Sequence, residues 1–402
     1  MKPGILIVGA GQAGAEVACA LRDRGYTESI SIVGEEAYAP YQRPPLSKAY
    51  LAGKADAQTL ALRSDEFFER AQIALVKSQR VVNVALADGG EGGEATTDTG
   101  HKIAFERLIL AVGASPRRMS VPGSELAGIH YLRDIRDAEA LKVGLERAQS
   151  VVVVGGGFIG LEAAAVARAR GKAVTLIEGG PRVIGRVVAP VVSEFYLKAH
   201  QRRGTEIRLN AAVTGFDGEN GVVTAVRLAD GSSINADLVV VGIGVQPRLE
   251  LAEQLRLRCE GGGIWVDEFA RTSHPSVFAI GDCTVSPHPL ALGRHVRLES
   301  VPHATEQAKT AAATIMGNAE PYVAVPWFWS DQDSMKLQIA GLSHGFDQTV
   351  MRGNPDAERF AVYYFRDGKF LAVDAVNSPR DFMAGRRALT SGKEFSPADV
   401  AA

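Results

Sequence analysis

The chain has 402 residues, 46% of them apolar and 22% charged, which is typical of a folded protein with about two to four domains. Lysine and arginine (44) nearly balance aspartate and glutamate (46). A nucleic-acid or anionic-membrane protein normally has a basic excess, so we expect neither partner. The sequence shows no signal-peptide layout and no apolar run of membrane-spanning length, and we therefore expect a cytoplasmic protein.

The three cysteines, Cys19, Cys259 and Cys283, lie far apart in the sequence. This small, odd number favours a reducing compartment over a disulfide framework. No closely spaced pair is available for zinc or for a local dithiol, and we expect no metal site. Glycine is unusually frequent, with 43 residues against a usual share of about 7%.

Many of these glycines belong to a unit that occurs twice. Residues 5–14 and 151–160 each read as a short apolar strand, a Gly-x-Gly-x-x-Gly loop and the start of a helix. A second apolar strand follows in both copies, at 30–33 and 174–177, and an acidic residue follows each, Glu35 and Glu178. The sequence thus predicts two copies of one strand–loop–helix–strand unit.

This layout is typical of a dinucleotide site. The first glycine makes the turn, the second lets the backbone approach a pyrophosphate, and the third permits close packing of helix on strand. The helix N-terminus attracts the phosphates, and the acid binds a ribose diol. Two such sites favour FAD plus a nicotinamide nucleotide. The Glu178 carboxylate repels a 2′-phosphate and favours NADH over NADPH, although Arg182 follows closely.

Further segments complete each unit. Apolar strands near 108–112 and 238–241 end in glycine turns and return the chain from one unit to the next. The strand at 277–280 ends at Gly281–Asp282, where a carboxylate is well placed for the ribityl hydroxyls of a flavin. Strands flank the polar stretch 88–100, and Asn-Gly and Asp-Gly turns occur at 220–221 and 230–231, so we expect a small antiparallel insertion in each unit.

The C-terminal third contains a helix and a separate small domain. Ser300 and Pro302 are typical of a helix start, and an alanine-rich run continues to residue 316. A helix N-terminus aimed at the N1–C2=O edge of a flavin would stabilise negative charge there. From residue 322 we expect three strands, at 336–341, 359–365 and 370–376, and a helix at 379–389. Trp327 and Trp329 at the start of this domain either shield the flavin or pack its core.

Three segments are more specific than the glycine loops: residues 40–48 (PYQRPPLSK), 297–301 (RLESV) and 326–332 (PWFWSDQ). With them, the whole chain resembles the FAD-dependent ferredoxin reductases of bacterial oxygenase systems, of the glutathione-reductase-like flavoproteins. The resemblance implies an α/β fold with two Rossmann-like dinucleotide-binding domains, for FAD and NAD, plus a small C-terminal α+β domain. The expected boundaries are 1–117 with 244–321 for the FAD domain, 118–243 for the NAD domain, and 322–402 for the C-terminal domain.

The resemblance also implies the reaction. FAD takes a hydride from NADH and passes single electrons to a 2Fe-2S ferredoxin that serves a monooxygenase or dioxygenase. Lys48 is expected near flavin N5, paired with Glu162. Disulfide reductases of similar architecture carry a cysteine pair in the region of residues 43–48, where this chain has none. Thiol chemistry is therefore excluded at this place; Arg43 and Lys48 offset negative charge instead.

The expected site residues fall into three groups. The FAD group consists of Gly9, Gly11, Gln12, Ala13, Gly14, Glu35, Arg43, Pro45, Lys48, Ala111, Gly113, Asp282, Glu299, Ser300, Val301, His303 and Trp329. The NAD group consists of Gly155, Gly157, Phe158, Ile159, Gly160, Glu178, Arg186, Gly242, Ile243 and Gly244. Ferredoxin docking is expected at Arg63, Arg297, Lys309 and Lys336. Two residues depart from the family pattern: His303 stands where relatives often have an amide, and Asp333 where an aromatic is usual.

Two other functions stay open on the sequence. One is an NADH oxidase or another pyridine-nucleotide flavoprotein reductase, of which the thiol-dependent kinds need a cysteine near the flavin. The other is a signalling flavoprotein resembling apoptosis-inducing factor. That function predicts a basic nucleic-acid-binding surface and a targeting segment, and the sequence shows neither.

Overall fold

The fold was established from a computed structural model, which describes residues 3–87 and 91–401. The chain divides into two compact units. The first comprises Met1–Gln42, Leu60–Ser115 and Gln246–Phe328, and the second comprises Arg43–Thr59, Pro116–Val245 and Trp329–Ala402. Each unit is built around its own parallel sheet.

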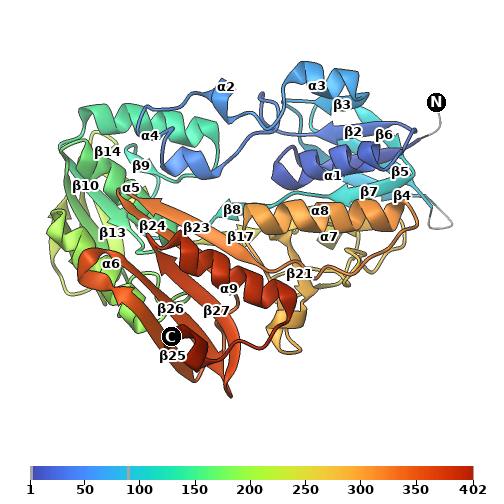
Figure 1. Cartoon of the computed structure of the whole chain (residues 1–402). Helices are drawn as coiled ribbons and strands as arrows, with labels where there is room; N and C mark the ends of the chain where they lie inside the picture. The colour runs from blue at the N-terminus through green and yellow to red at the C-terminus, as the bar shows by residue number, and fades with distance from the viewer. Residues whose placement is uncertain (1–2, 88–90, 402) are drawn as a thin grey trace. The chain divides into compact units, whose positions relative to one another are not determined.

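The sheet of the first unit has five parallel strands in the order β20-β7-β1-β2-β3. Their bounds are β1 (Ile5–Val8), β2 (Ile30–Val33), β3 (Ile73–Val76), β7 (Arg107–Leu110) and β20 (Val277–Ala279). All four residues of β1 are buried, as expected for the central strand of a sheet covered on both faces. Helices α1 (Gln12–Asp23) and α8 (Val301–Ile315) run side by side (Figure 1) and pack on the face that includes Ile5 and Ile7.

The sheet of the second unit repeats this plan, in the order β9-β16-β10-β11-β12. Its strands, again all parallel, are β9 (Ile129–His130), β10 (Ser150–Val154), β11 (Ala173–Ile177), β12 (Thr205–Arg208) and β16 (Leu238–Val241). Strand for strand, β10 takes the place of β1, β11 of β2, β16 of β7 and β9 of β20. Helix α5 (Phe158–Ala169) follows β10 as α1 follows β1. The predicted duplication is confirmed in the topology.

Each unit also carries the expected antiparallel insertion. The three strands in the first unit are β4 (Val81–Leu86), β5 (Gly93–Thr97) and β6 (Lys102–Phe105); those in the second are β13 (Val213–Glu219), β14 (Val222–Leu228) and β15 (Ser233–Asn235). Strands β4 and β6 flank the polar stretch 88–100 as predicted, and a further strand, β5, lies inside it; residues 88–90 are outside the described residues. The polar residues Glu94 and Thr96 alternate with the buried Ala95 and Thr97 in this strand. The segment therefore looks polar in the sequence although one face of the strand is buried.

The C-terminal domain holds more strands than predicted. Five form one sheet in the order β23-β24-β27-β26-β25. They are β23 (Trp327–Gln332), β24 (Met335–Gly341), β25 (Gln348–Asn354), β26 (Arg359–Arg366) and β27 (Lys369–Val376). The prediction missed β23 and β25. The predicted helix is confirmed as α9 (Pro379–Ser391), which packs against β27 and β24 (Figure 1).

The remaining elements are short or peripheral. The helices are α2 (Ala57–Leu60), α3 (Asp65–Arg70), α4 (Ile135–Arg147), α6 (Pro190–Arg202), α7 (Glu250–Gln254) and α10 (Pro397–Ala401). The other strands are β8 (Ala114–Pro116), β17 (Val245–Pro247), β18 (Cys259–Glu260), β19 (Gly263–Trp265), β21 (Thr284–Pro287) and β22 (His295–Val296). The 3-10 turns are η1 (Pro44–Ser47), η2 (Gly281–Cys283), η3 (Pro289–Ala291) and η4 (Pro355–Ala357).

The predicted fold class, α/β with two Rossmann-like units and a small C-terminal α+β domain, is confirmed. Across residues 3–87 and 91–401, every helix is too short or too polar to cross a membrane. Over the same residues, no group of three or more histidine, cysteine, aspartate or glutamate side chains is arranged to hold a metal ion.

Candidate active site

The loop between β1 and α1 has the geometry that a pyrophosphate requires. Gly9 adopts φ +118°, and a Cβ there would lie 2.2 Å from the Ala111 carbonyl oxygen. A Cβ on Gly14 would lie 2.0 Å from the Gly9 oxygen, so helix and strand pack too closely for any side chain. Gly11 differs, because a Cβ there would meet nothing within 4 Å. The first and third glycines are fixed by packing, and the second faces open space that suits a phosphate.

Two polar atoms in the first unit add to this fit. Gln12 Oε1 and His303 Nε2 are buried and have no hydrogen-bond partner among the described residues. Buried polar atoms are nearly always paired in folded proteins, so each marks a place that a ligand or water completes. Together with the open side of Gly11 and the α1 and α8 N-termini, these atoms fit a dinucleotide such as FAD.

The other predicted FAD residues of the first unit lie at strand and helix ends. Glu35 follows β2 and is ion-paired with Arg248. Asp282 lies in η2 directly after β20, where the Gly281 N–H donates to Gln307 Oε1 at 2.7 Å. Glu299 pairs with Arg297. Ser300 caps α8, whose first residue is Val301, by accepting from the His303 N–H, as predicted. Gly113, which adopts φ +65°, accepts from the Arg248 N–H.

His303 is 2% exposed, and its Nδ1 lies 2.9 Å from the Tyr322 hydroxyl. Burial lowers the pKa of His303 to about 4, against an ordinary value of 6.5, although Asp282 acts in the opposite direction. The folded protein therefore holds the neutral imidazole, while the unfolded chain takes up a proton below pH 6.5.

This shift predicts a pH-dependent loss of stability. The contribution of His303 is complete above pH 6.5 and is lost as the pH falls toward about 4, which amounts to about 3 kcal/mol. In urea unfolding, the native protein should lose more free energy between pH 7 and pH 4.5 than the His303→Asn variant does. Equal losses in the two proteins would show that His303 does not titrate in this way.

The second glycine loop repeats the first. Gly155 adopts φ +106°, and a Cβ on Gly160 would lie 2.0 Å from the Gly155 oxygen. The nearest atom to a Cβ on Gly157 is the Gly242 oxygen, at 3.9 Å, so the second glycine again faces space. Phe158 and Ile159 begin α5 directly after this glycine. The loop therefore fits a second pyrophosphate.

Glu178 is held at the predicted place, after β11. Its two carboxylate oxygens accept from the Gly156 N–H at 2.6 Å and the Gly180 N–H at 2.7 Å. The nearby Arg182 turns to backbone carbonyls, donating to Gly185 at 2.9 Å and to Val188 at 3.4 Å. The loop thus presents the Glu178 carboxylate as a fixed negative charge. The Arg182 guanidinium is already hydrogen-bonded to backbone carbonyls.

Two further residues predicted to bind NAD are brought together. The Arg186 guanidinium lies 3.7 Å from where a Cβ on Gly244 would be. Gly242 packs against Gly160, and its N–H bonds the Val154 oxygen; Ile243 follows it in the same turn. The turn after β16 thus lies against the second glycine loop, as the turn after β7 lies against the first.

The second unit contains a buried ionic cluster, centred on Glu162 of α5. The Glu162 side chain is 3% exposed, and its Oε2 lies 2.7 Å from Lys48 Nζ. The Ser47 hydroxyl donates to the same oxygen at 2.5 Å, and the Ser330 hydroxyl donates to Oε1 at 2.5 Å. Lys48 also donates to the Pro44 carbonyl at 3.1 Å. The predicted Lys48–Glu162 pair is therefore present, within a larger cluster.

The segment before Lys48 is anchored in the same unit. Arg43 donates to the Arg133 carbonyl at 2.8 Å, and Pro45 lies in η1. Trp329 lies on β23 as the last of three consecutive aromatic residues, directly before Ser330. Prolines in η1 stiffen the backbone that presents Lys48.

None of the cysteines forms a redox pair. All three are free thiols. Cys283 is fully buried and its Sγ lies against the Leu110 and Ile280 carbonyls; burial raises its pKa to about 12. A thiolate nucleophile requires the opposite shift, so Cys283 is not poised to act as one.

The four predicted docking cations differ in their partners. Arg297 pairs with Glu299, and Lys309 pairs with Glu306 at 2.8 Å. Arg63 and Lys336 are exposed and have no acidic partner within ion-pairing distance in the part of the chain that the structure describes. Asp333, the departure from the family pattern, forms the β23–β24 turn with φ +56° and pairs with Arg203 at 3.1 Å.

Sequence reasoning missed several residues that the structure places in these sites. They are Ser47, Ser330 and Gln332 in the ionic cluster, Gln307 behind Gly281, and Arg248 beside Glu35. Ser47, Ser330 and Gln332 lie inside two of the three specific segments, 40–48 and 326–332, which was the available signal. Ser47 and Ser330 are 115 and 168 residues away from Glu162, which they contact, and local patterns do not reveal such contacts.

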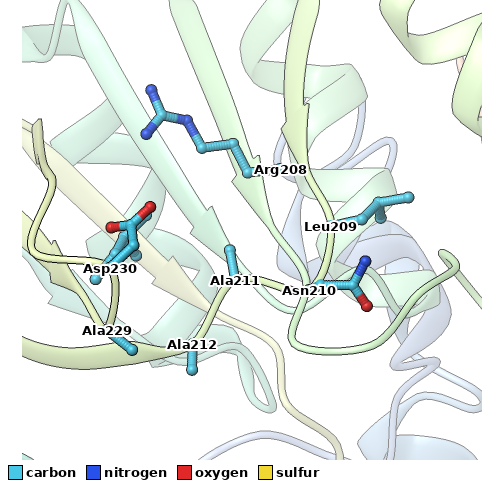
Figure 2. A pocket seen from close by; sticks show the side chains of 8 residues that line it. Arg208, Leu209, Asn210, Ala211, Ala212, Ala229 and Asp230 are labelled. Carbon is cyan, nitrogen blue, oxygen red and sulfur yellow. The ribbon is translucent and has the colours of Figure 1, made fainter.

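One hollow in the second unit lies outside these groups. Its volume is about 370 Å³, and it is lined by residues 208–212 and 228–230 at the end of β12. Figure 2 shows its three alanine methyl groups, from Ala211, Ala212 and Ala229, among the larger side chains. None of the predicted site residues lines this hollow.

Two protein families match this chain, one over its two dinucleotide-binding units and one over its C-terminal domain. Residues 3–308 match the family described as pyridine nucleotide-disulphide oxidoreductase, and residues 327–402 match the family described as reductase C-terminal. Rhodocoxin reductase of Rhodococcus erythropolis is 43% identical over 398 residues, covering 99% of this chain and 92% of that protein.

Two solved structures are similar over the whole chain. The ferredoxin reductase for the CYP199A2 system from Rhodopseudomonas palustris has a TM-score of 0.95 at 40% identity, covering 100% of this chain and 98% of that one. The reductase of the covalent putidaredoxin reductase–putidaredoxin complex has a TM-score of 0.94 at 38% identity, covering 100% and 96%. The predicted resemblance is confirmed: this chain belongs to the pyridine nucleotide-disulphide oxidoreductases, enzymes that use FAD and NAD(P)H, and it carries their reductase C-terminal domain.

Proposed function

We propose that the protein is an NADH-dependent ferredoxin reductase that passes electrons to a 2Fe-2S ferredoxin of a monooxygenase or dioxygenase system. The observation that carries this proposal is the Lys48–Glu162 pair. Lys48 of this pair stands in the segment where thiol reductases of this architecture have their cysteines. The similarity to rhodocoxin reductase and to putidaredoxin reductase supports the same function.

Bound FAD supplies the conversion of a two-electron hydride into single electrons. In this chain, the proposed holders are the Gly9–Gly14 loop, Glu35, Asp282 and the N-terminal turn of α8. The second loop and Glu178 hold the nicotinamide nucleotide. We propose that Lys48 supplies positive charge at the hydride-transfer step and that Glu162 fixes its position.

We propose NADH over NADPH because of the Glu178 environment. Its carboxylate is held by two backbone N–H groups, and Arg182 is engaged by two carbonyls. A 2′-phosphate at this strand end meets the fixed negative charge of Glu178.

Glu178→Gln should therefore change the coenzyme preference. We expect kcat/KM for NADH to fall and that for NADPH to rise, moving their ratio by about tenfold or more. The matched control is Glu206→Gln, which removes an exposed carboxylate from the neighbouring strand β12. If both variants keep the native ratio, Glu178 does not set the preference.

The proposed partner is tested by reconstitution with putidaredoxin and other 2Fe-2S ferredoxins. NADH-driven cytochrome c reduction should depend strongly on added ferredoxin. Reversing the charge of Arg63 and Lys336 together should slow ferredoxin reduction by about tenfold at low salt, because ferredoxins are acidic. NADH-driven reduction of a small dye needs no protein docking and should be retained.

The control for this experiment reverses two other exposed cations, Arg24 and Lys369. It should leave ferredoxin reduction at the native rate. Equal loss with dye and with ferredoxin in the Arg63 and Lys336 variant would contradict the docking assignment. Ferredoxin-independent cytochrome c reduction would contradict the proposed function itself.

A further inference from the structure

The Glu162 carboxylate accepts hydrogen bonds from two segments of the second unit, the end of η1 and strand β23. Lys48 and Ser47 both donate to Oε2. Ser330, on β23 of the C-terminal domain, donates to Oε1 and is the one described residue that does so. The Ser330 side chain is fully buried, so water does not replace it easily. Removing its hydroxyl leaves a buried charged oxygen without a donor, which is costly.

Behind Ser330, the hydrogen bonds continue through two more buried residues. Gln332 Nε2 donates to Ser330 Oγ at 3.1 Å, and Gln332 Oε1 lies 2.8 Å from His200 Nε2. Gln332 is fully buried and His200, on α6, is 1% exposed. Burial lowers the pKa of His200, so the neutral ring is present at neutral pH.

The chemistry of these groups fixes the direction of donation. An amide oxygen only accepts, so His200 Nε2 carries the hydrogen and donates to Gln332. The Gln332 amide then donates to Ser330, whose own hydrogen is left to point at Glu162. Every hydrogen in the series points toward the carboxylate. Such aligned bonds strengthen one another in a buried setting.

We propose that Ser330, Gln332 and His200 are positioning residues for hydride transfer, which orient the Glu162 carboxylate toward Lys48. This inference rests on the proposed function of the Lys48–Glu162 pair. Ser330 holds Oε1 so that Oε2 stays directed at the ammonium group. Gln332, fixed by His200, sets the rotamer of the Ser330 hydroxyl. The C-terminal domain thereby contributes to the active site through β23.

The test uses the FAD-loaded enzyme and two readouts. Stopped-flow mixing with NADH, without ferredoxin, measures flavin reduction. Infrared spectroscopy measures the Glu162 carboxylate stretch, assigned by its absence in Glu162→Gln. Ser330→Ala should slow flavin reduction by about tenfold with little change in the NADH concentration at half-saturation. The carboxylate band should move to higher wavenumber because a donor is lost.

Two variants separate positioning from packing. Ser330→Thr keeps the hydroxyl and should restore both the rate and the band. Ser193→Ala removes an equally buried hydroxyl of the same unit, one that donates to the Val183 carbonyl. It should lower thermal stability without changing rate or band.

A further variant serves if Ser330→Ala does not fold. Gln332→Glu is nearly isosteric but has no amide hydrogen, so it takes the Ser330 hydrogen bond away from Glu162. It should slow flavin reduction and move the same band. The proposal is overturned if Ser330→Ala keeps the native rate and band, or if Ser193→Ala reproduces its effects. The infrared readout needs neither NADH nor ferredoxin, so an enzyme that failed to use ferredoxin would still decide the role of Ser330.

Discussion

Replacing Glu162 by glutamine is expected to slow NADH-driven flavin reduction by about 100-fold. The carboxylate accepts from Lys48, Ser47 and Ser330 in a site where it is 3% exposed. An amide in its place turns a donor toward other donors and leaves the ammonium group without a counter-charge. Breaking a buried pair in this way costs about 3–5 kcal/mol, and about 3 kcal/mol in the activation barrier accounts for the expected slowing.

The duplicated architecture provides a matched control for this variant. Glu16 occupies the same position in α1 as Glu162 does in α5. Its Oε1 accepts only from Gln12 Nε2 at 3.0 Å among the described residues, so Glu16→Gln should reduce flavin at close to the native rate. Thermal unfolding of both variants, with retained flavin absorbance, distinguishes slow chemistry from loss of fold. A folded, flavin-loaded Glu162→Gln protein with the native rate would remove Glu162 from the reaction.

Exchanging the second glycine of each loop should separate the two nucleotide sites. Gly11→Ala places a methyl group where the structure has open space, and the backbone of Gly11 is extended, with φ −101°. The variant should therefore fold but purify nearly colourless, with FAD affinity reduced by about 100-fold or more, because the pyrophosphate needs that space.

Gly157→Ala should give the reciprocal result. Its backbone is also compatible with alanine, with φ −80°. We expect a yellow protein whose flavin is photoreduced normally but is reduced by NADH only at concentrations about 100-fold higher. Visible absorbance and NADH titration measure the two effects. Loss of flavin from Gly157→Ala, or full flavin retention by Gly11→Ala, would contradict the assignment of the loops.

Local sequence patterns predicted the parts of the fold that depend on local physics. The strand–glycine–helix unit occurs twice, and both copies fold with the same strand order. Strand β25 escaped prediction because six of its seven residues are exposed, which removes the apolar alternation that marks a half-buried strand. The aromatic residues of β23 were instead weighed as flavin-shielding or core side chains.

The site was predictable only in part, for a similar reason. Lys48 and Glu162 came from the family resemblance, because 114 residues separate them and no local pattern links them. Ser330, Gln332 and His200 meet Glu162 only when β23 and α6 pack in the second unit. Tertiary contacts of this kind depend on the assembled fold, whereas a glycine turn depends on neighbours in the chain.

The most direct test of the proposed function is an electron count. With a catalytic amount of the FAD-loaded protein, oxygen excluded and a 2Fe-2S ferredoxin in excess, each NADH consumed should reduce two ferredoxin molecules. That ratio follows from converting one hydride into two separate electrons. Rapid bleaching of the flavin by NADH without any reduction of ferredoxin would contradict the proposal.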